Sequence, residues 1–66
     1  MTYIQLTCEQ RQALDLTSLE EGYVVEQIND CVDTEGNITE PHGYYQVITI
    51  DNTKQWEYVG TRPPHR

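Results

Sequence analysis

Apolar and polar residues are patterned most clearly between Gly43 and Val59, where two runs rich in β-branched and aromatic residues flank a polar turn. Such runs favour strands, so the arrangement predicts a β-hairpin of Tyr44–Ile50 and Gln55–Val59 around the turn Asp51–Lys54. The length of the loop then decides which side chains share a face, because a one-residue slip in register moves every side chain to the other face.

We expect a three-residue loop in this hairpin. Such a loop places Ile48 and Ile50 on the same face as Trp56 and Tyr58, whereas a loop of two or four residues pairs the isoleucines with polar residues of the second strand. The three-residue loop also requires a positive φ, which Asn52 or its neighbour can adopt. The face with both isoleucines is therefore expected to be the buried one.

Two short elements are predicted at the start of the chain. Thr2–Leu6 alternates polar and apolar residues, which suits a short edge strand or an extended arm. Thr7 can accept a hydrogen bond from the amide of Gln10, and the Gln10 side chain can return one to Thr7, which is a capping box. We therefore expect a helix from about Cys8 to Asp15, stabilised mainly by lying on the sheet.

The segment Ser18–Val32 has two interpretations. Its apolar residues meet the helical period, but Gly22 would interrupt the helix and the Tyr-Val-Val run is typical of a strand. We expect a single turn over Ser18–Glu21 and then a strand over Tyr23–Val32. In that strand Val24, Ile28 and Val32 would share one face with Glu26 and Asp30, while Tyr23, Val25 and Cys31 would share the other.

The predicted fold is α+β: a small three- to four-stranded antiparallel β-meander with one short N-terminal helix. Residues 33–43 are rich in turn formers and are expected to be a loop. Residues 1–60 form a single domain, and residues 61–66, with Pro63-Pro64, form an exposed tail. The core predicted from this arrangement comprises Ile48, Ile50, Trp56, Leu14, Ile28 and either Val24 or Val25.

The charge of the chain is strongly asymmetric. Eleven acidic residues face four basic ones, and the net charge is −7. No Lys or Arg occurs between Gln12 and Thr53, a stretch with nine carboxylates. Binding to nucleic acid and to anionic lipid depends largely on Lys and Arg contacts with phosphates. We therefore expect neither direct nucleic-acid binding nor membrane binding, and no stretch approaches the ~20 apolar residues of a membrane span.

Cys8 and Cys31 could form one disulfide, but a single pair is far from a disulfide framework, and no leader with a basic start and an apolar core precedes them. Two free thiols in a cytoplasmic protein are the preferred interpretation. The sequon Asn37-Ile38-Thr39 is then a chance match.

Catalytic and metal sites are not expected. Cys8, Cys31, His42 and His65 include the ligand types of zinc, but they lack the close paired spacing of structural zinc sites. Cys31 and His42 could form a nucleophile and base only if the fold brought them together in a cleft, and no motif surrounds either residue. We expect a protein that is not an enzyme and needs no cofactor.

The function predicted is that of a small acidic module that binds another protein with a basic surface. The residues proposed for this contact are the seven carboxylates of the acidic segment 20–40, namely Glu20, Glu21, Glu26, Asp30, Asp33, Glu35 and Glu40. One alternative is an inhibitor from a phage or mobile element whose carboxylates partly mimic nucleic-acid phosphates. A less favoured alternative is a small enzyme or metal protein that uses Cys31 and His42.

Self-association is predicted as well, because a chain of 66 residues buries only about 60% of its unfolded surface. The expected hairpin has apolar residues on both faces, and one short helix covers only one of them. Tyr45, Val47 and Val59 on the second face are the predicted contact residues of a homodimer.

Overall fold

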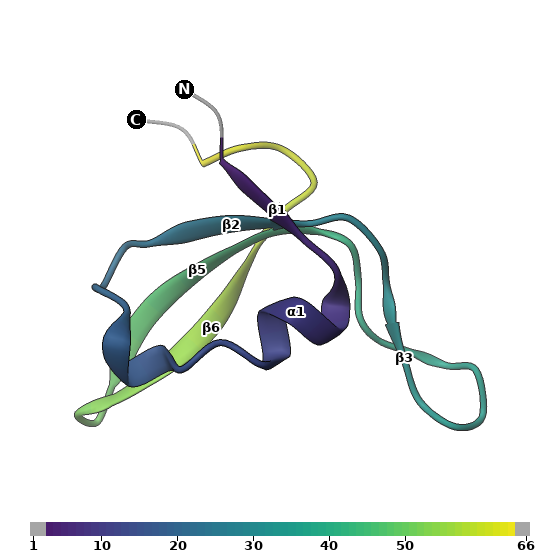
Figure 1. Ribbon diagram of the computed structural model, residues 1–66, viewed down its shortest axis with the longest axis horizontal. Coiled ribbons are helices and arrows are strands. Elements are labelled where there is room, and N and C mark those ends of the chain that lie inside the picture. The colour runs from purple at the N-terminus through teal and green to yellow at the C-terminus, as the bar shows by residue number, and fades with distance from the viewer. Residues whose placement is uncertain (1–2, 65–66) are drawn as a thin grey trace.

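The computed structural model describes residues 3–64 and contains a four-stranded sheet with the strand order β1-β2-β5-β6. Figure 1 shows this sheet, with a small second hairpin projecting beyond one end. The main sheet comprises β1 (Ile4–Leu6), β2 (Val24–Gln27), β5 (Gly43–Ile50) and β6 (Thr53–Gly60). The projecting hairpin consists of β3 (Cys31–Val32) and β4 (Ile38–Glu40). The α+β expectation is confirmed.

The sheet is mixed rather than wholly antiparallel, because β1 runs parallel to β2. Between them the chain forms the helix α1 (Cys8–Gln12) and the 3₁₀-helix η1 (Leu16–Ser18). This crossover returns the chain to the starting end of the sheet, which is what a parallel pair requires. The antiparallel meander predicted from the sequence therefore holds for β2, β5 and β6, and the possible N-terminal strand exists but in the parallel sense.

The β5–β6 hairpin has a two-residue loop, so the expectation of three residues is wrong. Asp51 and Asn52 both have positive φ, 51° and 63°, and Ile50 pairs directly with Thr53. Two adjacent residues in this region give the type I′ turn, whose twist matches that of the flanking strands. Asp and Asn tolerate this conformation best after glycine, which explains why the polar pair sets the register.

This register exchanges the two faces of the hairpin relative to the expectation. Val47 lies opposite Trp56 and Tyr45 lies opposite Tyr58, so these four side chains share the face that packs inward. Tyr45 and Val47 are buried, whereas Ile50 is 47% exposed. The predicted burial is therefore wrong for Ile50, and Ile48 is half-buried on the opposite face.

The core joins this inner face to the helix. Its buried residues are Cys8, Arg11, Val25, Gln27, Cys31, Gly43, Tyr45 and Val47. Val25 is fully buried, as one of the predicted alternatives required, but Ile28 is 55% exposed. Leu14, Ile48 and Trp56 are half-buried. The prediction of the core is thus correct for Val25 and wrong for Ile28 and Ile50.

The expected elements before the hairpin are present in shortened form. The capping box of Thr7 and Gln10 is confirmed, but α1 ends at Gln12. The turn expected over Ser18–Glu21 lies two residues earlier as η1, because Asp15 caps it by accepting a hydrogen bond from the amide of Thr17. The sequence therefore predicted the start of the helix correctly and its end three residues too late.

The strand expected over Tyr23–Val32 is divided into β2 and β3. The chain bends after Gln27, where Asn29 Oδ1 accepts a hydrogen bond from the Cys8 amide and Asp30 Oδ1 accepts one from the His42 amide. These bonds replace the strand ladder. The loop expected over residues 33–43 contains β4, which pairs with β3. In the turn between these two strands, Gly36 has a φ of 86°.

The end of the chain follows β6 directly. Residues 61–63 are exposed, as expected for a tail, and Pro64 is half-buried. Met1, Thr2, His65 and Arg66 lie outside the described residues, so the parts of the predicted strand, domain and tail that fall on them lie outside them too. In the part of the chain that is described, no helix is long and apolar enough to cross a membrane.

Candidate protein-binding surfaces

The acidic segment 20–40 does not form a regular row of carboxylates. Glu20 and Glu21 lie in the turn between η1 and β2, and Glu26 lies in β2. Because β2 ends at Gln27, Glu26 and Asp30 do not share a strand face, and that expectation is wrong. The even spacing on which phosphate mimicry depends is therefore absent between these two residues.

Two carboxylates of the segment hold connections of the fold. Asp30 Oδ1 accepts a hydrogen bond of 2.6 Å from the His42 amide and lies 2.9 Å from the His42 ring Nδ1. Asp33 Oδ1 accepts bonds of 2.9 Å from the amides of Asn37 and Glu35. The His42 amide lowers the pKa of Asp30, and the Asn37 amide lowers the pKa of Asp33. Both carboxylates therefore stabilise the fold in their charged form.

A third carboxylate, Glu40, pairs with a buried arginine. Arg11 Nη2 donates to Glu40 Oε1, and Arg11 Nε donates to Gln27 Oε1. The Arg11 side chain is 1% exposed, whereas that of Glu40 is 38% exposed. The guanidinium carbon lies 4.0 Å from the centroid of the Tyr45 ring and 5.5 Å from that of Trp56. Arg11 therefore joins the helix to the sheet rather than contributing positive charge to the surface.

Three carboxylates of the segment remain available at the surface. Glu20, Glu21 and Glu35 are exposed, and within residues 3–64 their side chains make no hydrogen bond or ion pair. Glu26 is half-buried and accepts a hydrogen bond of 3.0 Å from Gln5 Nε2. Of the seven predicted contact residues, the structure therefore leaves Glu20, Glu21 and Glu35 with no role in the fold.

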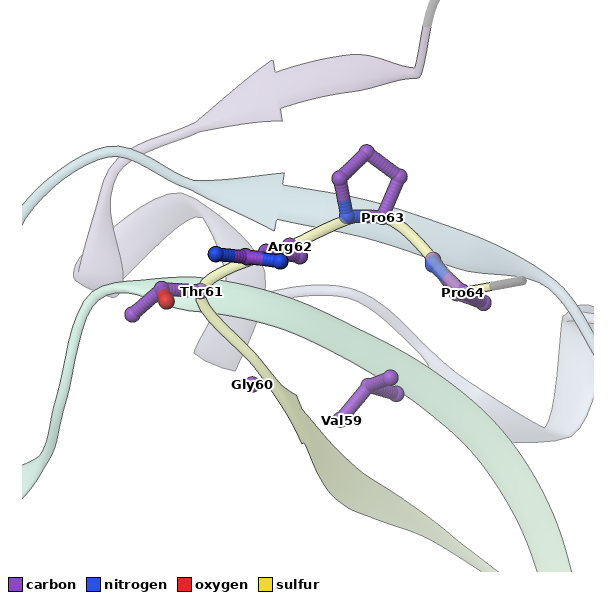
Figure 2. A pocket seen from close by; sticks show the side chains of 6 residues that line it. All are labelled: Val59, Gly60, Thr61, Arg62, Pro63 and Pro64. Carbon is purple, nitrogen blue, oxygen red and sulfur yellow. The ribbon is translucent and has the colours of Figure 1, made fainter.

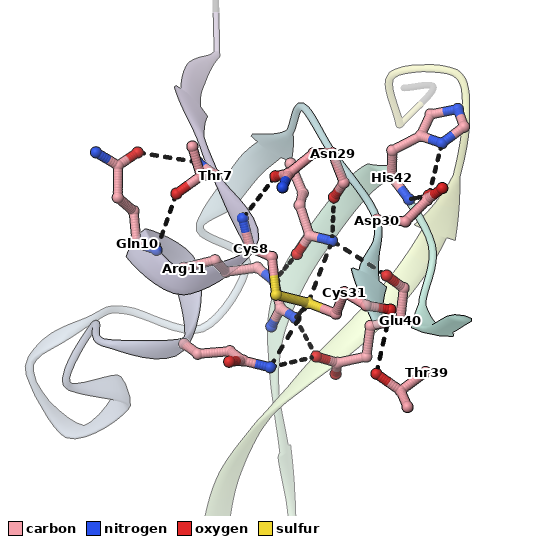
Figure 3. The surroundings of a disulfide bond; sticks show 12 residues. Thr7, Cys8, Gln10, Arg11, Asn29, Asp30, Cys31, Thr39, Glu40 and His42 are labelled. Atoms are coloured by element: carbon pink, nitrogen blue, oxygen red, sulfur yellow. Dashed lines mark hydrogen bonds and ion pairs between the residues drawn. A yellow bond between two sulfur atoms is a disulfide. The ribbon is translucent and has the colours of Figure 1, made fainter. Parts of the chain in front are cut away.

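Cys8 and Cys31 form a disulfide with a Cα–Cα distance of 5.4 Å, so the prediction of two free thiols is wrong. Figure 3 shows the bond between α1 and the projecting hairpin, with Arg11 and Glu40 beside it. The Cys8 amide also donates to Asn29 Oδ1, two residues before Cys31, so the two segments are joined at a second point. Disulfides persist mainly in oxidising compartments. The cytoplasmic location expected from the sequence stays a prediction.

The disulfide also bears on the alternative of a small enzyme or metal protein that uses Cys31 and His42. Cys31 presents no thiol while the bond is intact, and the ring of His42 is held by Asp30 instead. Within residues 3–64 no three Cys, His, Asp or Glu side chains gather in a way that could hold a metal ion. His65, the fourth ligand considered, lies outside the described residues.

The predicted self-association residues differ in exposure. Tyr45 and Val47 are buried on the inner face, where the Tyr45 hydroxyl donates to the Pro41 carbonyl at 2.7 Å. Burial makes both side chains inaccessible to a second copy, so this part of the prediction is corrected. Val59 lies between the paired residues Tyr58 and Gly60, where the register shifts, and is 36% exposed.

The outer face of the sheet has no covering element among residues 3–64. Both α1 and η1 lie against the inner face, since Arg11 contacts Tyr45 and Trp56 there and Lys54 Nζ donates to the Leu19 carbonyl. Apolar and polar residues both occur on the outer face, which carries Tyr3, Gln5, Val24, Glu26, Tyr44, Gln46, Ile48, Ile50, Gln55 and Glu57. This mixture is typical of a sheet face in water.

Two tyrosines contact each other on this outer face. The rings of Tyr3 and Tyr44 meet edge to face, with centroids 5.6 Å apart. Partial burial raises the pKa of Tyr44, and the nearby Glu26 carboxylate raises it further. Both effects keep the hydroxyl neutral.

A separate surface pocket lies at the end of β6. It is lined by the consecutive residues Val59–Pro64, and Figure 2 shows the chain turning there from β6 into the proline pair. Because one continuous segment forms it, the pocket brings together no residues from distant parts of the sequence. Its only charged side chain is that of Arg62.

The sequence interpretation missed Arg11 and Gln27, the two buried polar residues. A signal for Arg11 was present, because Cys8 and Arg11 are three residues apart and therefore share one face of a helix. No local signal distinguishes Gln27 from the other glutamines of the chain. No protein-family model, curated protein or solved structure matches this chain.

Proposed function

We propose that the protein is a non-enzymatic module that binds another protein through complementary charge, with a basic surface on the partner. The supporting observation is the poor neutralisation of its carboxylates. Within residues 3–64 only two ion pairs occur, Arg11–Glu40 and His42–Asp30, and Arg11 is buried. Most carboxylates of the described residues therefore have no neighbouring cation.

Glu20 and Glu21 are the carboxylates that we place at the centre of this contact. They are adjacent and exposed, and their charge is not used by any turn or ion pair within residues 3–64. Charges of this kind attract an oppositely charged partner over a distance set by the ionic strength, and they chiefly accelerate association. Binding is consequently expected to be fast at low salt and sensitive to added salt.

The test begins with the protein immobilised and exposed to an extract of its source cells, followed by purification of the retained partner and measurement of association rates. Replacing Glu20 and Glu21 by Gln should lower the association rate roughly three- to tenfold at low salt. The difference from the parent should vanish near about 0.5 M NaCl, where the Debye length is short.

A matched control variant carries Glu9→Gln and Glu57→Gln, which remove the same amount of charge from α1 and β6. It should associate nearly as fast as the parent protein if the contact is local. A partner that binds the Glu20/Glu21 variant as fast and as salt-sensitively as the parent would contradict the proposal, and the carboxylates would then serve solubility alone.

A further inference from the structure

Strand β6 forms one edge of the main sheet. It contains eight residues, whereas β1 at the opposite edge contains three. An edge strand presents a row of backbone N–H and C=O groups that can pair with another strand. Within residues 3–64, β6 is therefore the longer of the two edges at which this sheet could be extended.

The turn of the hairpin fixes which β6 residues bond to β5. Asp51 and Asn52 occupy the two central positions, so the hydrogen bond that closes a turn of this kind joins Ile50 to Thr53. In an antiparallel ladder, directly opposed residues alternate between hydrogen-bonded and non-hydrogen-bonded pairs. The pattern along the whole of β6 follows from this first pair.

Counting from Thr53, Gln55 and Glu57 direct their backbone groups toward β5. Lys54, Trp56 and Tyr58 direct theirs away from the sheet. Among the described residues, no backbone hydrogen bond from a turn or loop reaches these three. The free edge thus offers three consecutive sites, each with one donor and one acceptor.

This edge lacks proline and bulges, two features that usually protect an edge strand from pairing. Residues 53–60 contain no proline, and the irregularity in the ladder lies beyond Tyr58, opposite the step from Tyr44 to Tyr45. The ammonium of Lys54 points across the inner face to the Leu19 carbonyl and therefore does not lie along the free edge. Proline and bulges are therefore missing from Lys54–Tyr58, and its two charged residues, Lys54 and Glu57, have opposite signs.

Charge favours a second copy as the occupant. The molecule carries a net charge of −7, but residues 53–60 contain one Lys and one Glu and are neutral. A basic peptide would find its complement on the carboxylates elsewhere, whereas two neutral edges approach each other with little repulsion. The shapes also match, because two identical antiparallel edges are complementary by symmetry.

We propose that the protein forms a homodimer in which β6 pairs antiparallel with β6 of a second copy, with the two-fold axis at Trp56. The two four-stranded sheets then become one continuous sheet. This register places Trp56 opposite Trp56 of the second copy and Lys54 opposite its Tyr58, so every outward-directed backbone group is paired. On the outer face Gln55 lies opposite Glu57 of the second copy, where an amide can donate to a carboxylate.

Neighbouring registers are less favourable. An axis at Glu57 would place the two Glu57 carboxylates opposite each other, and like charges directly opposed across strands are destabilising. An axis at Gln55 would leave the outward groups of Tyr58 without a partner. The Trp56 axis is the one that avoids the repulsion and uses the whole edge.

The first experiment measures sedimentation equilibrium and amide hydrogen exchange on the protein alone, from about 10 µM to about 1 mM. Mass should rise toward twice 7.7 kDa with concentration. Over the same range the amides of Lys54, Trp56 and Tyr58 should become protected, while those of Gln55 and Glu57 are protected throughout. This experiment uses no partner protein, so a negative result would leave the proposed function untouched.

The second experiment tests the register. Gln55→Glu places like charges opposite each other twice in each dimer and should raise the dissociation constant by about two- to thirtyfold. Gln55→Lys creates two opposite-charge pairs and should lower it. Gln10→Glu is the matched control, since it adds the same charge on α1 and keeps a capping-box residue at that position.

Two results would overturn the proposal. One is a mass of 7.7 kDa at every concentration. The other is a dimer whose formation leaves the Lys54, Trp56 and Tyr58 amides exchanging as fast as in the monomer. Equal effects of Gln55→Glu and Gln10→Glu would overturn the register, because only net charge would then matter.

Discussion

At the scale of single residues, the most informative side chain is Arg11. It comes from a helix of five residues, and its guanidinium lies against the Tyr45 ring with Gln27 and Glu40 as hydrogen-bond partners. A buried cation is costly unless its donors are satisfied. Within residues 3–64 no buried side-chain nitrogen or oxygen is left without a partner. The network is thus complete, which is the condition for such a core to specify one structure.

Replacing Arg11 by Met should therefore destabilise the fold strongly. The change removes the donor to the buried Gln27 Oε1 and leaves the Glu40 carboxylate without its cation. Leaving a buried polar atom such as Gln27 Oε1 unpaired costs about 1–3 kcal/mol, which is a large fraction of the stability of a small domain. Urea unfolding followed by Trp56 fluorescence measures the loss.

Glu40→Gln provides the contrast in this experiment. The Glu40 side chain is partly exposed, and the amide oxygen of Gln can still accept from Arg11. Its cost should be clearly smaller than that of Arg11→Met. Equal midpoints for the parent protein and Arg11→Met would contradict the role assigned to the buried guanidinium.

At the scale of elements, the disulfide connects two pieces that are too short to be stable alone. Helix α1 has five residues and β3 has two. Isolated helices shorter than about 12 residues are marginal in water. The Cys8–Cys31 bond, which spans 23 positions in the sequence, keeps α1 and the projecting hairpin together.

Removing this bond should lower stability by about 3 kcal/mol, because the unfolded chain regains the conformational entropy that closing a loop of this length removes. The variant Cys8→Ala/Cys31→Ala should therefore melt at a lower temperature than the oxidised parent. Reducing the parent with dithiothreitol should lower its melting temperature in the same direction. A parent protein whose melting temperature is the same with and without reductant would show that the bond contributes nothing to stability.

At the scale of the whole molecule, the connections depend on charged aspartates. Hydrogen bonds from Thr17, the His42 amide and the Asn37 amide lower the pKa of Asp15, Asp30 and Asp33, respectively, below the ordinary value of 3.8. A carboxylate whose pKa is lower in the folded state stabilises that state above its unfolded pKa. This contribution is lost as the pH falls through the lower folded value.

Acidification should therefore lower the melting temperature, with the decline beginning as the pH approaches the ordinary carboxyl pKa of 3.8 and continuing below it. Asp33→Asn separates this effect from the general change in net charge. Its amide oxygen can accept from the same two backbone amides but has no charge to lose, so its melting temperature should depend less on pH. An identical pH profile for Asp33→Asn would rule out a contribution from Asp33.

The sequence alone determined those features that depend on neighbouring residues. The capping box of Thr7 and Gln10 starts a helix wherever the chain places it, because both hydrogen bonds are local. The strands of the hairpin and the positive φ of Asn52 follow in the same way from β-propensity and turn chemistry. The acidity of the surface is likewise a property of composition.

Tertiary structure decided everything that depends on a distant partner. Which face of the hairpin is buried was decided by the helix, because Arg11 of α1 packs against Tyr45 and Trp56. The Asn29 side chain accepts a hydrogen bond from the Cys8 amide, and Cys8 and Cys31 meet in the disulfide. The free edge of β6 exists because the sheet stops there. These outcomes arise from hydrogen bonds and packing between residues far apart in the chain, which no local pattern encodes.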